Sequence, residues 1–186
     1  MFELIKRSTS GCKLIAPRVF RDDRGEFVKP YNWNGLQAVG VRLTVKEEIF
    51  SVSRKNVLRG LHFQIPPYDH QKLIYCVKGK ILDVVVDIRA NSPHFGEVFS
   101  AELSSENRRL LLVPRGFVHG FLSLEDYSTV VYKTDTVYAP DHDQGIRWDS
   151  IDFEWPLKHP LLSERDSITP ALKDFVSPFD DTYPDD

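Results

Sequence analysis

Between Asn56 and Arg89 the sequence places many ionisable and hydrogen-bonding side chains on stretches that have the pattern of core strands. They are Arg59, His62, Gln64, Lys72, Asp83, Asp87 and Arg89. Removing such groups from water costs several kcal/mol each unless they are paired or used. A satisfied polar network would account for any one of them. The combination of His62 with Lys72 indicates a catalytic site, because an imidazole can move a proton while an ammonium stabilises a nearby negative charge.

Three strands in quick succession are expected to position these groups: Asn56–Gln64, Gln71–Val77 and Ile81–Arg89. A Pro-Pro loop separates the first two, and a Lys-Gly-Lys turn separates the last two. In the third strand two sets alternate with the period of a strand that has two different faces: Asp83, Val85 and Asp87, and Val84, Val86 and Ile88. Arg59 and His62 have opposite strand parity, so both can reach one pocket only through a bulge or a twist.

The rest of the chain predicts more short strands and almost no helix. The expected strands are one within CKLIAPRVF (residues 12–20), then Val41–Ser53, Glu97–Leu103, Leu110–Val113, Gly120–Leu124 and Ser128–Thr134. Short strands at this spacing, divided by turns such as Asp22–Glu26, are typical of a β-sandwich or barrel. We therefore expect one all-β domain over residues 1–186, with one helical turn within 32–40.

The C-terminal part is expected to contain a helix and an acidic tail in place of further strands. A helix is expected to start at Ser163, which would be its N-cap, with Asp166 at the third helical position. The acidic stretch Pro178–Asp186 is expected to be a frayed tail.

Bulk properties exclude several function classes. Among the 186 residues, 41% are hydrophobic and 27% charged, and the net charge of −3 gives no reason to expect nucleic acid as a partner. No apolar run approaches the length of a membrane span, and the N-terminus lacks the apolar core of a signal peptide. Cys12 and Cys76 are too few for a disulfide scaffold and indicate free thiols in a reducing cytoplasm.

A motif narrows the type of barrel. Residues 114–119, PRGFVH, match the second sequence motif of cupins and end on His119. His62 occupies the first histidine position of the other cupin motif. Gln64 and Lys72 stand where a second metal-binding histidine and a glutamate would be. Because a cationic lysine repels a divalent metal and an amide replaces imidazole poorly, we expect a cupin pocket without a metal.

Longer blocks carry a closer resemblance, which covers about residues 13–170. In order they are VLRGLHFQ, QKLIYCVKGKILDVVVDIR, SPHFGE, LSSENRRLLLVPRGFVHGF, VVYKTDTVYAP, IRWDSIDFEWP and LLSERD. They resemble the dTDP-4-dehydrorhamnose 3,5-epimerase family. The resemblance implies a double-stranded β-helix (jelly roll), usually a homodimer with an exchanged N-terminal region. It also implies action on a nucleotide-linked 4-keto sugar without metal or other cofactor.

The resemblance also implies roles. A hydrogen next to a ketone is weakly acidic, so its removal needs a positioned base and a group that stabilises the enolate oxygen. His62 corresponds to the base and Asp166 to its carboxylate partner. Tyr132 corresponds to the acid on the other face of the sugar. Lys72 corresponds to the cation that stabilises the enolate, with His119 and Arg59 nearby.

The nucleotide side both matches the family and departs from it. The matching positions are Arg24, Phe27, Tyr138, which would stack on the base, Asp143 in place of glutamate, and Arg165 in place of lysine. Three positions differ: Lys29 replaces a glutamate, and Glu47 and Ile49 replace two amides. These changes leave open whether the base is thymine or another pyrimidine such as cytosine, and whether one carbon or two is inverted.

Two rival functions stay open on the sequence. A related cupin isomerase would shift a keto group between carbons 3 and 4 of such a sugar, but it lacks this arrangement of His62 and Tyr132. A cupin that only binds a sugar nucleotide would not need an acid and a base on opposed faces.

Overall fold

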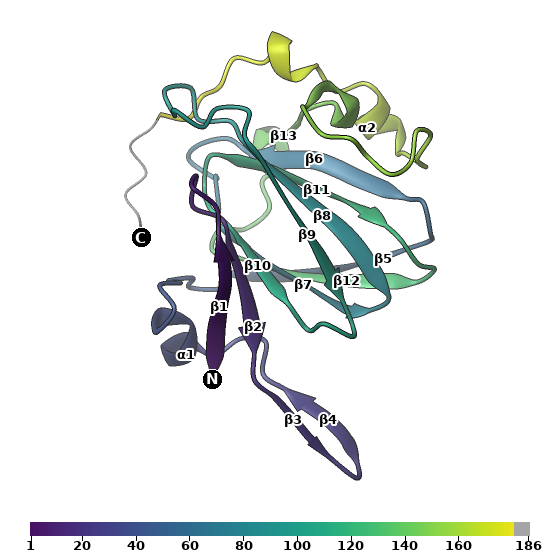
Figure 1. The fold of residues 1–186 in the computed structure, drawn as a ribbon. Coiled ribbons are helices and arrows are strands. Elements are labelled where there is room, and N and C mark those ends of the chain that lie inside the picture. The colour runs from purple at the N-terminus through teal and green to yellow at the C-terminus, as the bar shows by residue number, and fades with distance from the viewer. Residues whose placement is uncertain (181–186) are drawn as a thin grey trace.

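Two antiparallel sheets face each other and form a jelly roll in the computed structural model, which describes residues 1–180 (Figure 1). The first sheet has the order β1 (Phe2–Arg7), β2 (Lys13–Pro17), β10 (Leu110–Val113), β7 (Lys72–Lys78), β12 (Ser128–Thr134) and β5 (Glu47–Ser53). The second has the order β13 (Asp143–Gly145), β6 (Leu58–Gln64), β11 (Phe117–Ser123), β8 (Lys80–Asp87) and β9 (Val98–Ser104). The predicted all-β jelly-roll fold is confirmed.

Smaller elements surround the two sheets. A hairpin of β3 (Val19–Asp22) and β4 (Gly25–Val28) extends away from them (Figure 1). The short helices are α1 (Trp33–Gln37), α2 (Glu164–Ser167) and the 3-10 turns η1 (Pro140–His142), η2 (Trp148–Ser150) and η3 (Leu172–Asp174). The turn within 22–26 and the helical turn within 32–40 are therefore confirmed. Among the described residues no helix is long and apolar enough to cross a membrane.

The alternation predicted for β8 separates two cores. Ile81 and Val85 lie between the two sheets, whereas Val84 and Val86 face outward. The outward face is covered by the C-terminal segment, which crosses it above β6 and β11 (Figure 1) and contributes Trp155. Because both faces of this sheet are covered, β8 and β11 are buried along almost their whole length.

Two strand predictions in the N-terminal part were wrong. The strand expected over Val41–Ser53 begins only at Glu47, because Val41 and Leu43 pack in a cluster with Leu36 of α1. Strand β1 was missed, since its side chains are mostly exposed and polar. The strand predicted within CKLIAPRVF is present as β2, which pairs with β1 on one side and β10 on the other.

The tail prediction was also wrong where the structure tests it. Phe179 is 1% exposed and packs its ring against Phe63. The backbone of Ala90 donates a hydrogen bond to the Phe179 carbonyl. The chain is therefore anchored up to this point, and the rest of the predicted frayed stretch, residues 181–186, lies outside the described part.

Candidate active site

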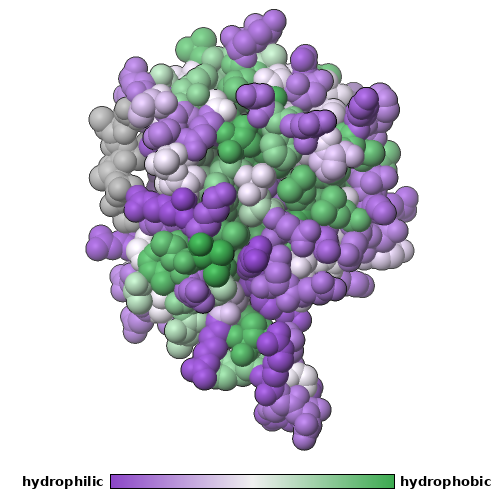
Figure 2. All heavy atoms as spheres, in the orientation of Figure 1, coloured by the Kyte–Doolittle hydropathy of each residue, from purple (hydrophilic) through white to green (hydrophobic). Residues whose placement is uncertain are grey.

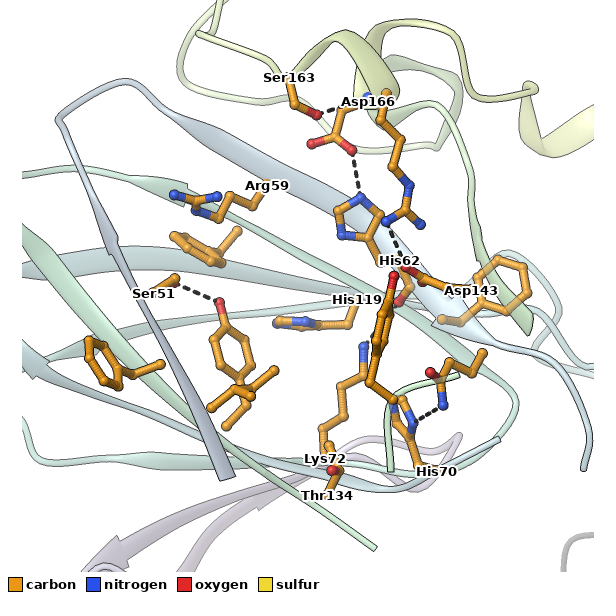
Figure 3. Close-up of a pocket in the computed structure, with 18 of the residues that line it drawn as sticks. Ser51, Arg59, His62, His70, Lys72, His119, Thr134, Asp143, Ser163 and Asp166 are labelled. Carbon is orange, nitrogen blue, oxygen red and sulfur yellow. Dashed lines mark hydrogen bonds and ion pairs between the residues drawn. The ribbon is translucent and has the colours of Figure 1, made fainter. Parts of the chain in front are cut away.

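A cavity of about 530 Å³ opens between the sheets and collects most of the predicted site residues (Figure 3). The predicted site residues in its lining are Glu47, Ile49, Arg59, His62, Lys72, His119, Tyr132, Tyr138, Asp143, Arg165 and Asp166. They come from β5, β6, β7, β11, β12 and the segments around β13 and α2. The fold therefore brings together residues that span almost 120 positions of the chain.

A break in the strand register brings Arg59 and His62 to the same cavity despite their parity. His119 pairs with His62, but Phe121 pairs with Arg59, so the register of β6 against β11 shifts by one residue between them. Gly60 lies within this irregularity with φ of 126°, and an added Cβ would meet the backbone of Gly120 at 2.6 Å. Only glycine fits there. The predicted bulge or twist is confirmed.

The predicted partners His62 and Asp166 form a hydrogen-bonded pair. The Nε2 of His62 lies 2.6 Å from Oδ1 of the buried Asp166. Burial alone would raise the pKa of Asp166, but hydrogen bonds from His62 and the Gly60 amide hold it below its ordinary value. A carboxylate accepts the Nε2 proton, which leaves Nδ1 of His62 with the lone pair that a general base needs.

The start of α2 positions Asp166 as the sequence predicted. Ser163 is the N-cap, and its hydroxyl accepts a hydrogen bond from the Asp166 amide at 3.1 Å. This cap fixes the backbone from which the carboxylate reaches His62. The helix-start role and the pairing with His62 therefore belong to the same residue.

Lys72 is a half-buried cation that lies below His62 in the view of Figure 3. Its Nζ donates a hydrogen bond to the His62 carbonyl at 3.2 Å. Desolvation lowers its pKa to about 8, against the opposing attraction of Asp143 and Asp83. The ammonium is thus still mostly protonated at neutral pH and is poorly compensated, so it is suited to an oxygen that gains negative charge.

His119 stands beside Lys72 and is held by Asp83. Its Nε2 lies 2.9 Å from Asp83 Oδ2, and both side chains are buried. Burial lowers the pKa of His119 and raises that of Asp83, in each case against the attraction of the partner. The pair is best described as a neutral imidazole with its orientation fixed by a carboxyl group.

Tyr132 comes from the other side of the cavity. Its hydroxyl is 3.2 Å from the hydroxyl of Ser51, and its ring meets the His119 ring edge-on at 6.1 Å. Burial raises the pKa of Tyr132, so the phenol keeps its proton. Ser51 lies on the opposite side of the cavity from His62 and Asp166 (Figure 3). A base and a neutral acid therefore face each other across the space.

Polar and aromatic groups surround the mouth of the cavity. Glu47 accepts a hydrogen bond from the Tyr138 amide at 2.5 Å, and Tyr138 is more than half exposed. Arg165 donates to Asp143 at 2.6 Å. This arrangement offers an exposed ring and a cation next to the deeper groups.

Three predicted binding residues lie elsewhere in the chain. Arg24, Phe27 and Lys29 belong to the β3–β4 hairpin and its flank, and none of them lines the main cavity. Phe27 and Lys29 instead line a shallow groove with Met1, Arg18 and Phe20. Within one chain Lys29 therefore lies apart from Glu47 and Ile49, which line the main cavity.

Sequence reasoning missed Ser51 and His70, which line the cavity, and Ser53, which lies next to it on β5. Ser51 and Ser53 share one face of β5, and Ser53 accepts a hydrogen bond from the Arg59 side chain at 3.0 Å. His70 also lines the cavity, and burial lowers its pKa to about 2. The serines carried a signal in their spacing of two, which places both hydroxyls on one strand face.

Two positions that bind the metal in other cupins are occupied here by Gln64 and Lys72. Gln64 uses its amide to brace loops, donating to the Tyr68 carbonyl at 2.7 Å and accepting from the Ala139 amide at 2.7 Å. Within residues 1–180 no group of three or more His, Cys, Asp or Glu side chains is placed to hold a metal ion.

Comparisons with known proteins identify the family of this chain. A family model described as dTDP-4-dehydrorhamnose 3,5-epimerase matches residues 6–174. The chain belongs to the dTDP-4-dehydrorhamnose 3,5-epimerase family. The Shigella flexneri dTDP-4-dehydrorhamnose 3,5-epimerase is 43% identical over 166 residues, which are 88% of this chain and 92% of that protein.

Solved structures of this family share the fold. The Bacillus anthracis dTDP-4-dehydrorhamnose 3,5-epimerase, with TDP and PPi bound, is 40% identical with a TM-score of 0.90, over 92% of this chain and 99% of that chain. A Legionella pneumophila dTDP-6-deoxy-D-glucose-3,5-epimerase in complex with dTDP-4-keto-L-rhamnose is 31% identical with a TM-score of 0.89, over 95% of each chain. The predicted family and enzyme class, an isomerase of nucleotide-linked sugars, are confirmed.

Proposed function

We propose that this chain inverts carbons 3 and 5 of a dTDP-linked 4-keto-6-deoxy sugar by proton removal and return next to the ketone. The observation that carries the proposal is the opposed pair. His62, oriented by Asp166 at 2.6 Å, lies on one side of the cavity, and the protonated Tyr132 comes from the other. Inversion at a carbon needs a base and an acid on opposite faces, whereas binding needs neither.

The first step takes a proton from the carbon next to the ketone. Nδ1 of His62 accepts the proton, and the electron pair of the C–H bond moves toward the ketone oxygen to form an enolate. The resulting imidazolium is stabilised by Asp166. Lys72 supplies a donor for the enolate oxygen, since it lines the cavity beside His62, and His119 lies next to it in the cavity lining.

The second step delivers a proton to the opposite face. The enolate electron pair forms a new C–H bond with the Tyr132 hydroxyl proton. Tyr132 is left as phenolate and His62 as imidazolium until water returns a proton to the first and takes one from the second. Burial favours the neutral phenol, so Tyr132 starts each turnover as an acid. The same pair of groups can act at both carbons that flank the ketone.

The nucleotide is proposed to lie at the mouth, with Tyr138 against the base and Arg165 and Arg59 toward the diphosphate. Arg59 is oriented by Ser53, and Arg165 by Asp143. The ligands named for the two solved relatives, TDP and a dTDP sugar, support this choice of nucleotide.

A homodimer in the cytoplasm is proposed as the working form. The hairpin carries the exposed rings of Phe20 and Phe27, and Figure 2 shows hydrophobic residues on it among hydrophilic ones. Covering these rings with a second copy would let its Arg24, Phe27 and Lys29 reach the neighbouring cavity. The free, buried Cys12 and Cys76 suit a reducing compartment.

The test is incubation with dTDP-4-keto-6-deoxyglucose in deuterated water, with exchange and inversion at each carbon followed by NMR. We expect deuterium and inversion at carbons 3 and 5 in the wild type, and neither in His62→Ala. Tyr132→Phe should keep exchange but lose inversion. Inversion by Tyr132→Phe at the wild-type rate would show that the acid is another group.

A further inference from the structure

Strand β5 lies at the end of the first sheet and carries two hydroxyl groups on one face, of which that of Ser51 lines the cavity. Ser51 and Ser53 share the face that also carries Ile49. The register places Tyr132 directly opposite Ile49, and Ser51 opposite Val130. Ser51 is therefore the diagonal neighbour of Tyr132 across the two strands, at a separation that a long aromatic side chain can span.

The two serines hold two different side chains of the site. Ser51 Oγ is 3.2 Å from the Tyr132 hydroxyl, as the dashed line in Figure 3 marks, and Ser53 Oγ accepts from Arg59 Nε at 3.0 Å. Ser53 is 2% exposed, whereas Ser51 is half-buried and lines the cavity. Each hydroxyl is short, so it fixes its partner without filling the space that the sugar needs.

We propose that Ser51 is a positioning residue for the second proton transfer: it holds the Tyr132 hydroxyl toward the sugar and donates a hydrogen bond to the phenolate oxygen that the transfer creates. This inference rests on the proposed function. The phenol proton goes to the sugar carbon, and the enolate electron pair forms the C–H bond. The serine proton stays on Ser51, so no further reactant is required.

The physical reason is the surroundings of Tyr132. Its side chain is half-buried and packs against the apolar core between the sheets, and desolvation raises its pKa, which makes the phenolate costly. The hydrogen bond with Ser51 works in the opposite direction. A donor that accompanies the developing charge strengthens as the charge grows, and it therefore stabilises the transition state more than the ground state.

The experiment compares Ser51→Ala with wild type in deuterated water, with exchange and inversion measured separately. Inversion should fall about three- to tenfold, the effect of one hydrogen bond, while exchange through His62 stays at the wild-type rate. Ser51→Thr, which restores the hydroxyl on a residue that suits a strand, should recover inversion. In a Tyr132→Phe background Ser51→Ala should add nothing, because Ser51 acts only through the tyrosine hydroxyl.

Ser53→Ala is the matched control on the same face of the same strand. It should raise KM, because it loosens Arg59, and should leave the ratio of inversion to exchange unchanged. An equal change of that ratio in both variants would mean that β5 is simply disturbed, and would overturn the inference. If Ser51→Ala does not fold, Ser51→Cys, a much weaker donor of similar size, is subject to the same comparison.

The failures can be told apart. Wild-type inversion by Ser51→Ala together with impaired inversion by Tyr132→Phe would refute the role of Ser51 and leave the proposed function intact. Wild-type inversion by both variants would refute the role of Tyr132 itself, and the inference about Ser51 would fall with it.

Discussion

The imidazole of His62 and the carboxylate of Asp166 are 104 residues apart in the sequence and 2.6 Å apart in the structure. His62 comes from the central part of β6, and Asp166 from the first turn of α2, whose N-cap is Ser163. The C-terminal segment that covers the outer face of the second sheet thus also delivers a carboxylate to the cavity. The same segment therefore contributes to the hydrophobic core and to the proposed active site.

Changing either member of this pair should separate orientation from proton transfer. His62→Ala should lower kcat about 100- to 10,000-fold, the usual effect of losing a general base. Asp166→Asn should cause a smaller loss, because the base stays but its orienting charge is gone. Steady-state kinetics and melting temperatures of both variants check this. A larger loss in a folded Asp166→Asn than in His62→Ala would contradict it.

The pH dependence should report on Lys72. Its pKa is lowered to about 8 by desolvation, so the ammonium that stabilises the enolate is present below pH 8 and is lost as the pH rises through that value. We expect kcat/KM to fall above about pH 8. Lys72→Arg keeps the cation and should move this decline to higher pH, whereas Lys72→Met should be inactive at every pH. An unchanged decline in Lys72→Arg would assign it to another group.

Chelators should leave activity intact. The cavity combines Lys72 with His62 and His119, and a cation among imidazoles opposes a divalent metal. The measurement is kcat after EDTA treatment and desalting, with an added divalent ion as the control. Loss on chelation that the ion restores would contradict a metal-free reaction.

Nucleotide preference should be measured directly, because Lys29, Glu47 and Ile49 differ in chemistry from the family pattern. Glu47 already accepts from the Tyr138 amide, so its carboxylate is fixed at the mouth. Calorimetric titration with dTDP, CDP, UDP and GDP is the test, and we expect dTDP to bind most tightly. Tighter binding of CDP would show that the altered residues select another base.

Assembly should depend on the β3–β4 hairpin. We expect a dimer at micromolar concentration in sedimentation experiments, and a shift toward monomer in a Phe20→Ser, Phe27→Ser variant, because these rings are exposed in the single chain. The variant should also bind nucleotide more weakly, since Arg24 and Lys29 would no longer reach a neighbouring cavity. A wild-type monomer would contradict this.

Much of the molecule followed from local patterns in the sequence. The alternation along 81–89 predicted a strand with two different faces, and the two faces of β8 pack in two separate cores. The serine at 163 with an acidic residue three positions later predicted a helix start, and α2 begins there. Such features depend on side-chain period and on hydrogen bonds within a few residues, so the sequence alone determines them.

Other features depended on packing between distant segments. The parity conflict between Arg59 and His62 was visible in the sequence, but its resolution by the irregular pairing of β6 with β11 around Gly60 was not. The hydrogen bond between Ser51 and Tyr132 exists because β5 pairs with β12 in one register. Phe179, in a stretch whose composition suggested a tail, is buried against Phe63. Only the tertiary structure decides these contacts, because each depends on where another part of the chain has already packed.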